Sequence, residues 1–404
     1  MDNVTHTLFA LTLARTPLGR GRGTTAALVL ASNAPDVDVV ATLGGAAEYL
    51  RWHRGPTHGP LGVIGLGLVT AGLVWGARRL IERRANGRAP RMTVAGQRAG
   101  SGGNDADAVA PFATLLFASV AGVVAHILMD LPTSYGTRML SPFSWRWFAM
   151  DLMPIIDVYL WAILAGGLVV GSRGAPGFRG ARDSRDFTRS RGSRWRGMRR
   201  HAAVGALALM AANYGVRAAA HQEALSIASR LYGSTLPAPC DGSAAFGSLF
   251  DSWPPPGELR IHPDHCLMDT SAVPDFLSPF EWRIIARQPD AYDVYRINVL
   301  DARLRNADAS AAFPSDDAAH VPNPWSALIA RAAATRSAQV LLGFSRSPVA
   351  SVLVEPSGAA TVQFTDLRFT GLENPRPQAR RSALFTVTVT FGPRNELLEE
   401  RLGQ

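Results

Sequence analysis

Apolar residues along this chain gather in long runs, which is the pattern of membrane-spanning helices rather than of amphipathic surface helices. Crossing a bilayer of about 30 Å takes roughly 17 to 25 predominantly apolar residues. The stretches of this kind are Leu61–Ala77, Val109–Met129, Ile155–Gly171 and His201–Ala220. The last of them carries Asn213 and Arg217 and is the weakest. The pattern predicts about four transmembrane helices.

Two shorter apolar segments, Val4–Ala14 and Thr24–Ala34, come before these spans. Between them lie Arg15, Arg20 and Arg22, so the chain turns at a basic bend. Each segment is too short to cross a bilayer comfortably. We therefore expect an N-terminal helical hairpin that dips into the membrane or packs on the bundle of spans.

The pattern changes after Gly233, where Pro, Asp and Trp become frequent and apolar residues alternate with polar ones. Alternation of this kind over Thr361–Phe369 and Leu384–Phe391 predicts strands, and Glu355–Gly358 predicts a hairpin turn. We expect a β-rich domain over residues 235–404. The two cysteines of the chain, Cys240 and Cys266, both lie in it and can form a disulfide in an oxidising compartment.

The composition agrees with a membrane protein and excludes a disordered one. Of the 404 residues, 47% are hydrophobic and only 18% are charged, against about 25% charged residues in ordinary soluble domains. The net charge is +9, and all 41 basic residues are arginine. The excess is concentrated between residues 173 and 200, where ten arginines face two aspartates, a local balance of +8.

Arginine-rich segments beside apolar spans indicate positive-inside topology rather than a nucleic-acid site. The linker over residues 78–108 and the one over residues 172–200 should then be cytoplasmic. Residues 49–60, residues 130–154 and everything after about residue 221 should face outward. This predicts a multi-pass protein of the bacterial inner membrane. Its parts are a membrane domain (1–171), a cytoplasmic linker (172–200), one further span (201–220) and the extracytoplasmic β-rich domain (235–404).

Histidines and aspartates gather at the predicted outer ends of the apolar segments. They are His6, Asp36, Asp38, His53, His58, His126 and Asp130. Charge-based topology therefore places all of these ligand-type side chains on one face of the membrane. Ionisable residues near membrane depth are costly and usually functional, so the agreement favours a site built from these groups over coincidence.

The spacing supports a metal site. His126 and Asp130 are four residues apart, so they lie on one face of a helix and can hold the same ion. Asp36 and Asp38 point the same way only in an extended segment, so one can ligate while the other serves as a base or a supporting group. Imidazole and carboxylate ligands suit Zn²⁺, with Mn²⁺ or Fe²⁺ as alternatives. Such an ion activates water, Asp38 or Asp130 can accept the proton, and Arg54 can pair with an anionic oxygen.

The order of these motifs resembles that of the YdjM-type inner-membrane metal-dependent hydrolases. The resemblance covers roughly residues 1–170 and rests on blocks that are specific in combination: Met-Asp-Asn-Val-Thr-His-Thr at residues 1–7, Asn-Ala-Pro-Asp-Val-Asp at 33–38, His-Arg-Gly-Pro-Thr-His at 53–58, and His126-x3-Asp130 followed by Tyr-Gly-Thr at 135–137 and Leu-Ser-Pro-Phe-Ser at 140–144. The His/Asp pattern is also similar to that of zinc-dependent phospholipase C. The resemblance implies a metal set of His6, Asp36, His53, His58, His126 and Asp130, to which Asp151 or Asp157 can add a ligand.

These observations together predict a membrane-bound, metal-dependent hydrolase that acts on a phosphoester or lipid-linked ester at the outer membrane surface. Its partner is then a membrane lipid or lipid-linked substrate and not a nucleic acid. The alternative is a non-enzymatic, metal-stabilised membrane scaffold whose β-rich domain binds a partner. A metal-ion transporter is disfavoured, because His or acidic residues are rare deep within the predicted spans.

Overall fold

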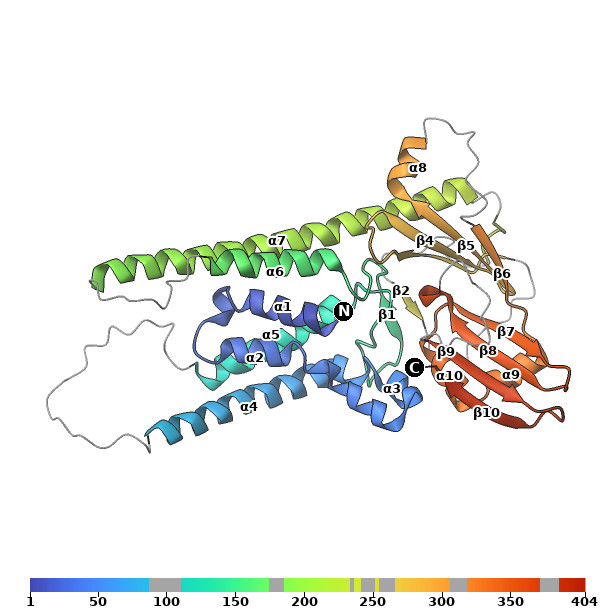
Figure 1. Cartoon of the computed structure of the whole chain (residues 1–404), viewed down its shortest axis with the longest axis horizontal. Helices are drawn as coiled ribbons and strands as arrows, with labels where there is room; N and C mark the ends of the chain where they lie inside the picture. Colours follow the sequence, from blue (N-terminus) through green and yellow to red (C-terminus); the bar gives the residue numbers. More distant parts are fainter. Residues whose placement is uncertain are drawn as a thin grey trace. The chain divides into compact units, whose positions relative to one another are not determined.

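The computed structural model describes residues 1–86, 110–173, 185–232, 236–240, 251–253, 266–305, 318–370 and 385–403 (Figure 1). The chain forms two compact units that cut across chain order. The first contains residues 1–37, 57–129 and 156–213, and the second contains residues 38–56, 130–155 and 214–404. The segments at 49–56 and 130–154, which the charge pattern assigns to one side of the membrane, thus fall in one unit with the chain after residue 214.

The first unit is helical. Its elements are α1 (Asn3–Leu13), η1 (Pro17–Gly19), α2 (Thr24–Ala31), α4 (Pro60–Asn86), α5 (Phe112–Asp130, of which the last residue is assigned to the second unit), α6 (Val158–Ser172) and the first part of α7 (Arg185–Tyr232). The 3₁₀ helices η2 (Pro35–Gly44) and η3 (Pro56–His58) cross its borders. α1 begins at Asp2, whose side chain caps the helix by accepting from the backbone N–H groups of Val4 and Thr5. The α1–α2 pair confirms the expected helical hairpin.

Within the described residues, three helices are long and apolar enough to cross a membrane, over Pro60–Arg84, Phe112–Asp130 and Gly197–Arg230. The bent pair α2 and η2 meets the same test as one broken span, with a bend of 44°. The predicted third span forms α6, which has 15 residues and is shorter than the others. A helical part with three to four candidate membrane spans, followed by a β-rich part, is therefore confirmed.

Glycines let the helices of the first unit approach closely. A Cβ built on Gly122 of α5 would lie 2.9 Å from the Cβ of Ala31 and 3.0 Å from the carbonyl oxygen of Leu28. A Cβ on Gly67 of α4 would lie 2.7 Å from Cγ2 of Val120. Membrane helices depend on such small-residue contacts, because lipid supplies no hydrophobic driving force for their association. These contacts hold α5 against α2 on one side and against α4 on the other.

The second unit is rich in antiparallel sheet. One four-stranded sheet has the order β3-β4-β5-β6, and a second has the order β10-β9-β8-β7. Their bounds are β3 (Asp269–Pro274), β4 (Glu281–Arg287), β5 (Ala291–Asn298), β6 (Ala318–Pro322), β7 (Pro348–Val354), β8 (Ala360–Asp366), β9 (Thr386–Phe391) and β10 (Leu397–Leu402). Its described helices include the last part of α7, from Tyr214, together with α3 (Ala46–Trp52), α8 (Val299–Arg305), α9 (Ala327–Ala333), α10 (Arg336–Phe344) and the short η5 (Leu367–Phe369).

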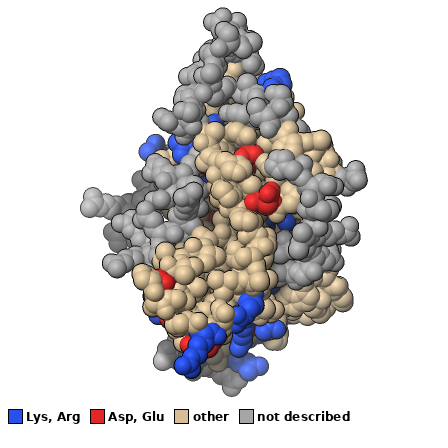
Figure 2. Space-filling view, turned by 90° about the vertical axis from the view of Figure 1, so that its right-hand side faces the viewer, with Lys and Arg blue, Asp and Glu red and all other residues tan. Residues whose placement is uncertain are grey.

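The strand predictions agree with this sheet. β8 and β9 fall in the two alternating runs, although the start of the second run, at Leu384, lies outside the described residues. The predicted turn joins β7 to β8, where Gly358 has a φ of +85° and donates its N–H to the carbonyl of Glu355. A disulfide joins Cys240 and Cys266, as expected. Figure 2 shows a face of the molecule whose coloured surface is mainly uncharged, with arginines near its lower end and few acidic side chains.

The loop between α5 and α6 belongs to the core of this second unit. It carries β1 (Trp147–Ala149), which pairs with β2 (Asp251–Trp253). The indole of Trp147 is fully buried, and its Nε1 donates to the carbonyl of Gly343. Tyr135 packs in the same cluster against Trp147 and Phe344. The loop that follows the His126-x3-Asp130 motif is thus built into the β-rich part of the chain.

Candidate metal centre

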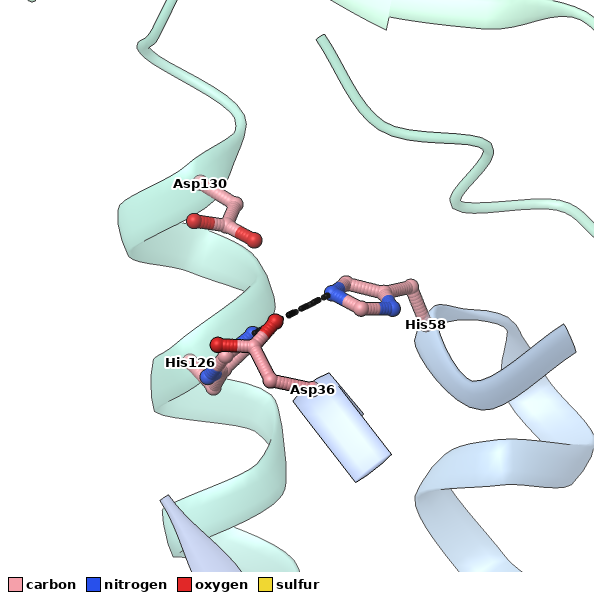
Figure 3. Close-up of side chains that lie close together, drawn as sticks. All are labelled: Asp36, His58, His126 and Asp130. Atoms are coloured by element: carbon pink, nitrogen blue, oxygen red, sulfur yellow. Dashed lines mark hydrogen bonds and ion pairs between the residues drawn. The ribbon is translucent and has the colours of Figure 1, made fainter. Parts of the chain in front are cut away.

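Three predicted ligands meet inside the first unit, each from a different element. Asp36 comes from η2, His58 ends η3, and His126 lies in the last turns of α5. The Nε2 atoms of His58 and His126 are 3.1 Å apart. Oδ1 of Asp36 lies 3.8 Å from Nε2 of His58 and 3.5 Å from Nε2 of His126. Figure 3 shows these side chains converging, with dashed lines joining them.

These distances fit a divalent ion. Two ligands bound at about 2.0–2.1 Å in tetrahedral geometry, as zinc prefers, lie about 3.4 Å apart. The three donor-atom separations run from 3.1 to 3.8 Å and bracket that value. Both imidazoles are fully buried, and the Asp36 side chain is only 17% exposed. The donor set therefore has the chemistry, the spacing and the burial that a zinc-type ion needs.

Hydrogen bonds on the far side of each imidazole fix the orientation of its ring. Nδ1 of His126 lies 2.8 Å from the carbonyl oxygen of Ser32, which can only accept, so Nδ1 carries the proton and Nε2 presents its lone pair to the cluster. Nδ1 of His58 lies 3.0 Å from the hydroxyl of Thr57. Backbone and hydroxyl partners of this kind are what ligating histidines use.

Asp130 completes the group from the end of α5. It lies one helical turn after His126, so the helix itself sets its place beside that residue. The ligand atoms of Asp36, His58, His126 and Asp130 all lie within 4.8 Å of one another. The Asp130 side chain is fully buried, and its Oδ1 accepts from Nη2 of Arg54 at 3.1 Å.

Arg54 supports Asp130 through a buried guanidinium. Its Nη1 also donates to the hydroxyl of Thr133 at 3.1 Å and to the carbonyl of Gly136 at 3.0 Å. The guanidinium stacks over the ring of Tyr135 at 4.6 Å, and burial raises the pKa of that phenol, which therefore stays neutral. The arrangement makes Arg54 a positioning group for the carboxylate of Asp130.

Asp38 and His53 form a neighbouring pair. Oδ1 of Asp38 lies 2.9 Å from Nδ1 of His53, and its Oδ2 accepts from the backbone N–H of Arg54 at 2.8 Å. Arg54 has a φ of 54°, a left-handed conformation that a non-glycine residue keeps only when its surroundings hold it. Asp38 thus anchors the His53–His58 loop. With Asp36, these two residues make a second group whose ligand atoms lie within 4.8 Å of one another.

Three other residues that the sequence suggested as ligands, His6, Asp151 and Asp157, lie outside the two groups of possible ligands among the described residues. His6 is buried in α1 and stacks on the ring of His126, with centroids 3.8 Å apart, but it is not one of the four grouped ligands. Asp157 caps α6 by accepting from the N–H of Leu160. Asp151 forms a buried ion pair with Arg346 at 2.5 Å.

Sequence reasoning did not identify the groups that orient the ligands. The carbonyl of Ser32 has no side-chain signature, because every residue carries a carbonyl. Thr57 stands inside the His53–His58 motif, directly before His58. A hydroxyl in this position could have been predicted to hydrogen-bond to the imidazole, as it does. Arg138 was also missed; it packs over Trp147 and donates to the carbonyl of Arg51, and burial lowers its pKa to about 10.

The segment that holds these residues matches a known protein family. A family model described as "YdjM inner membrane protein" matches residues 1–224, which is more than half of the chain and includes all the grouped ligands. A relative, the "Uncharacterized protein YfhP" of Bacillus subtilis (strain 168), is 26% identical over 152 residues. That alignment spans 37% of this chain and 38% of the relative. No solved structure gives a significant match.

Proposed function

The chain belongs to the YdjM inner membrane protein family, and from this premise we propose that it is a membrane-bound, metal-dependent hydrolase. The observation that carries the proposal is the spacing of Asp36, His58 and His126, whose donor atoms are 3.1 to 3.8 Å apart. A buried group of two imidazoles and a carboxylate is costly to keep without a cation. Three protein ligands also leave a fourth position for water or substrate, as in catalytic zinc sites.

In this proposal Asp36, His58 and His126 hold the ion, with Zn²⁺ favoured over Mn²⁺ or Fe²⁺ by the small, mixed donor set. When bound, the ion supplies Lewis acidity and an activated water near neutral pH. Asp130 is the carboxylate placed to accept the proton of that water, and Arg54 holds it in position through the 3.1 Å contact. Asp38 keeps His53 and the loop backbone in place.

The proposed substrate is a phosphoester or another lipid-linked ester at the outer face of the membrane. His58 lies just before α4, whose candidate span begins at Pro60, and Asp130 is the last residue of the span in α5. The ligands therefore stand at the ends of apolar helices, at the level where lipid headgroups meet water. The orientation of this end rests on the arginine-rich segments, which the positive-inside rule assigns to the cytoplasm.

The first test is the metal content of detergent-purified full-length protein, measured by elemental analysis. The wild type should carry about one or more Zn, Mn or Fe per chain. The His58→Ala, Asp130→Ala double variant should lose the metal. The His201→Ala variant is the matched control, because His201 is an exposed histidine on α7 outside the cluster. Negligible metal in the wild type, even after reconstitution with these ions, would exclude the mechanism.

The second test separates an enzyme from a scaffold. In a closed structural site Asp130 would be a fourth ligand, and the protein would have no open position. Asp130→Asn keeps the shape of the side chain but removes its charge. Retained metal with lost hydrolysis of a phosphodiester or phospholipid panel supports Asp130 as the proton acceptor. Lost metal, together with no hydrolysis by the wild type, favours the scaffold.

A further inference from the structure

A groove lies on the first unit, between α2 and α4, away from the metal ligands. Its volume is about 640 Å³. The two helices lie side by side along it (Figure 1). Its apolar lining includes Leu30, Leu73 and Ile81, whose side chains are 53%, 65% and 66% exposed. On a membrane-spanning helix, side chains with such exposure face acyl chains.

One end of the groove is basic. Arg22, just before α2, and Arg78, near the end of α4, both line it, against a single acidic residue, Glu82. Nη1 of Arg78 is buried and has no hydrogen-bond partner among the described residues. Gly23 makes room for this guanidinium, because a Cβ there would lie 2.7 Å from Nη1 of Arg78. The groove therefore presents two positive charges beside an apolar surface.

The position of Arg78 along α4 places it near the membrane boundary opposite the metal centre. From Pro60, two residues after His58, to Arg78 the helix advances 18 residues, or about 27 Å at 1.5 Å per residue. The hydrocarbon core of a bilayer is about 30 Å thick. If His58 stands at one lipid–water boundary, Arg78 reaches the headgroup level of the other.

We propose that this groove binds an anionic phospholipid in the leaflet opposite the metal centre. Its phosphate contacts Arg22 and Arg78, and an acyl chain lies on Leu30 and Leu73, which stand nearer the metal-centre end of α2 and α4 than these arginines do. A lipid fits better than a partner helix, because the groove joins an apolar surface to a pair of arginines that can bind a phosphate group. Basic pockets between membrane helices on the cytoplasmic side are known to select anionic headgroups. The bound lipid is distinct from a substrate, since the metal ligands lie about 27 Å away along α4.

The test is native mass spectrometry of the full chain in detergent, titrated with phosphatidylglycerol or phosphatidylcholine. The wild type should retain phosphatidylglycerol preferentially. Arg22→Gln with Arg78→Gln should weaken that binding about 25-fold, at roughly fivefold for each arginine. Arg79→Gln with Arg83→Gln is the matched control: Arg79 stacks on Trp75, and neither residue lines the groove, so binding should be unchanged.

Further arms keep the test decisive. Ala26→Trp fills the apolar part of the groove without changing charge, so it should also weaken binding and serves if the arginine variant does not fold. Soluble glycerol phosphate should compete poorly, because it lacks an acyl chain. Equal retention of both lipids, equal losses in the test and control pairs, or full competition by glycerol phosphate would each overturn the proposal. Metal content should be the same in all variants, which separates this result from the fate of the hydrolase proposal.

Discussion

Gly122→Ala is the substitution through which helix packing is expected to control the metal centre. Gly122 lies on α5 one turn before His126 and faces α2. The added methyl would meet the Cβ of Ala31 at 2.9 Å and the carbonyl oxygen of Leu28 at 3.0 Å. Ser32 follows Ala31 directly, and its carbonyl holds Nδ1 of His126 at 2.8 Å. A shift of α2 away from α5 is therefore transmitted to the ring of His126, a proposed ligand.

The contact distance between Gly122 and Ala31 gives the size of the helix shift. Carbon atoms pack best at about 3.5 to 4.0 Å, so the 2.9 Å approach to Ala31 falls short by about 0.6 to 1.1 Å. Metal–ligand distances tolerate about 0.2 Å, which is several times less. Loss of a supporting hydrogen bond to a ligating histidine typically costs 10- to 100-fold in metal affinity, a range of about 1.4 to 2.7 kcal/mol. Gly122→Ala should weaken zinc binding within this range.

The assay is competition for zinc with a chromophoric chelator, using detergent-purified full-length protein. Gly65→Ala is the matched control, because a Cβ on Gly65 of α4 meets nothing within 4 Å. Alanine also favours a helix over glycine by about 1 kcal/mol, so both variants should keep their helical circular dichroism. Wild-type zinc affinity in Gly122→Ala would show that the packing of α2 against α5 does not control zinc binding. An equal loss in Gly65→Ala would show a general effect of the substitution.

Three further outcomes are expected. Arg54→Ala leaves the buried carboxylate of Asp130 without its guanidinium and should lower the free energy of unfolding by about 3 to 5 kcal/mol in metal-free buffer. Adding Asp130→Asn to this variant should recover part of the lost stability. Purely additive effects of the two substitutions would contradict an interaction between the two side chains. Burial raises the pKa of Tyr292 to about 12, so the stability from its neutral phenol is complete below about pH 10 and is lost as the pH rises through about 12; Tyr292→Phe should flatten this alkaline decline in unfolding midpoints, and an unchanged slope would rule it out. Replacing Cys240 and Cys266 by serine opens a crosslink with a sequence separation of 26, worth about 3.5 kcal/mol by loop entropy, and an unchanged urea midpoint would count against that contribution.

Local pattern was enough for much of the fold. The apolar runs predict α4, α5 and the middle of α7 (residues 201–220), because a membrane span depends on length and composition alone. The same holds for the hairpin α1–α2 and for the alternating strands β8 and β9. The pairing of His126 with Asp130 is also local, since four residues on a helix share one face. The disulfide followed from there being two cysteines in one segment.

The grouping of the other ligands depends on contacts between distant parts of the chain. His58 and His126 are 68 residues apart, and their Nε2 atoms meet because α4 and α5 approach through Gly67 and α2 and α5 approach through Gly122. No periodicity encodes such an approach. Spacing likewise could not show that Asp36 belongs to both groups of possible ligands, whereas Asp38 belongs only to the group with His53.

Local sequence pattern sets which elements form, where ionisable side chains stand at their ends, and which chemistry those side chains allow. The contacts that each of these side chains makes depend on the tertiary structure. Packing set Asp36, His58 and His126 at ligand spacing, directed the guanidinium of Arg54 onto Asp130, and gave both oxygens of Asp38 to the His53–Arg54 loop. The physical reason is range: helix and strand formation respond to neighbours a few residues away, whereas a metal centre needs sub-ångström agreement between segments that only close packing can supply.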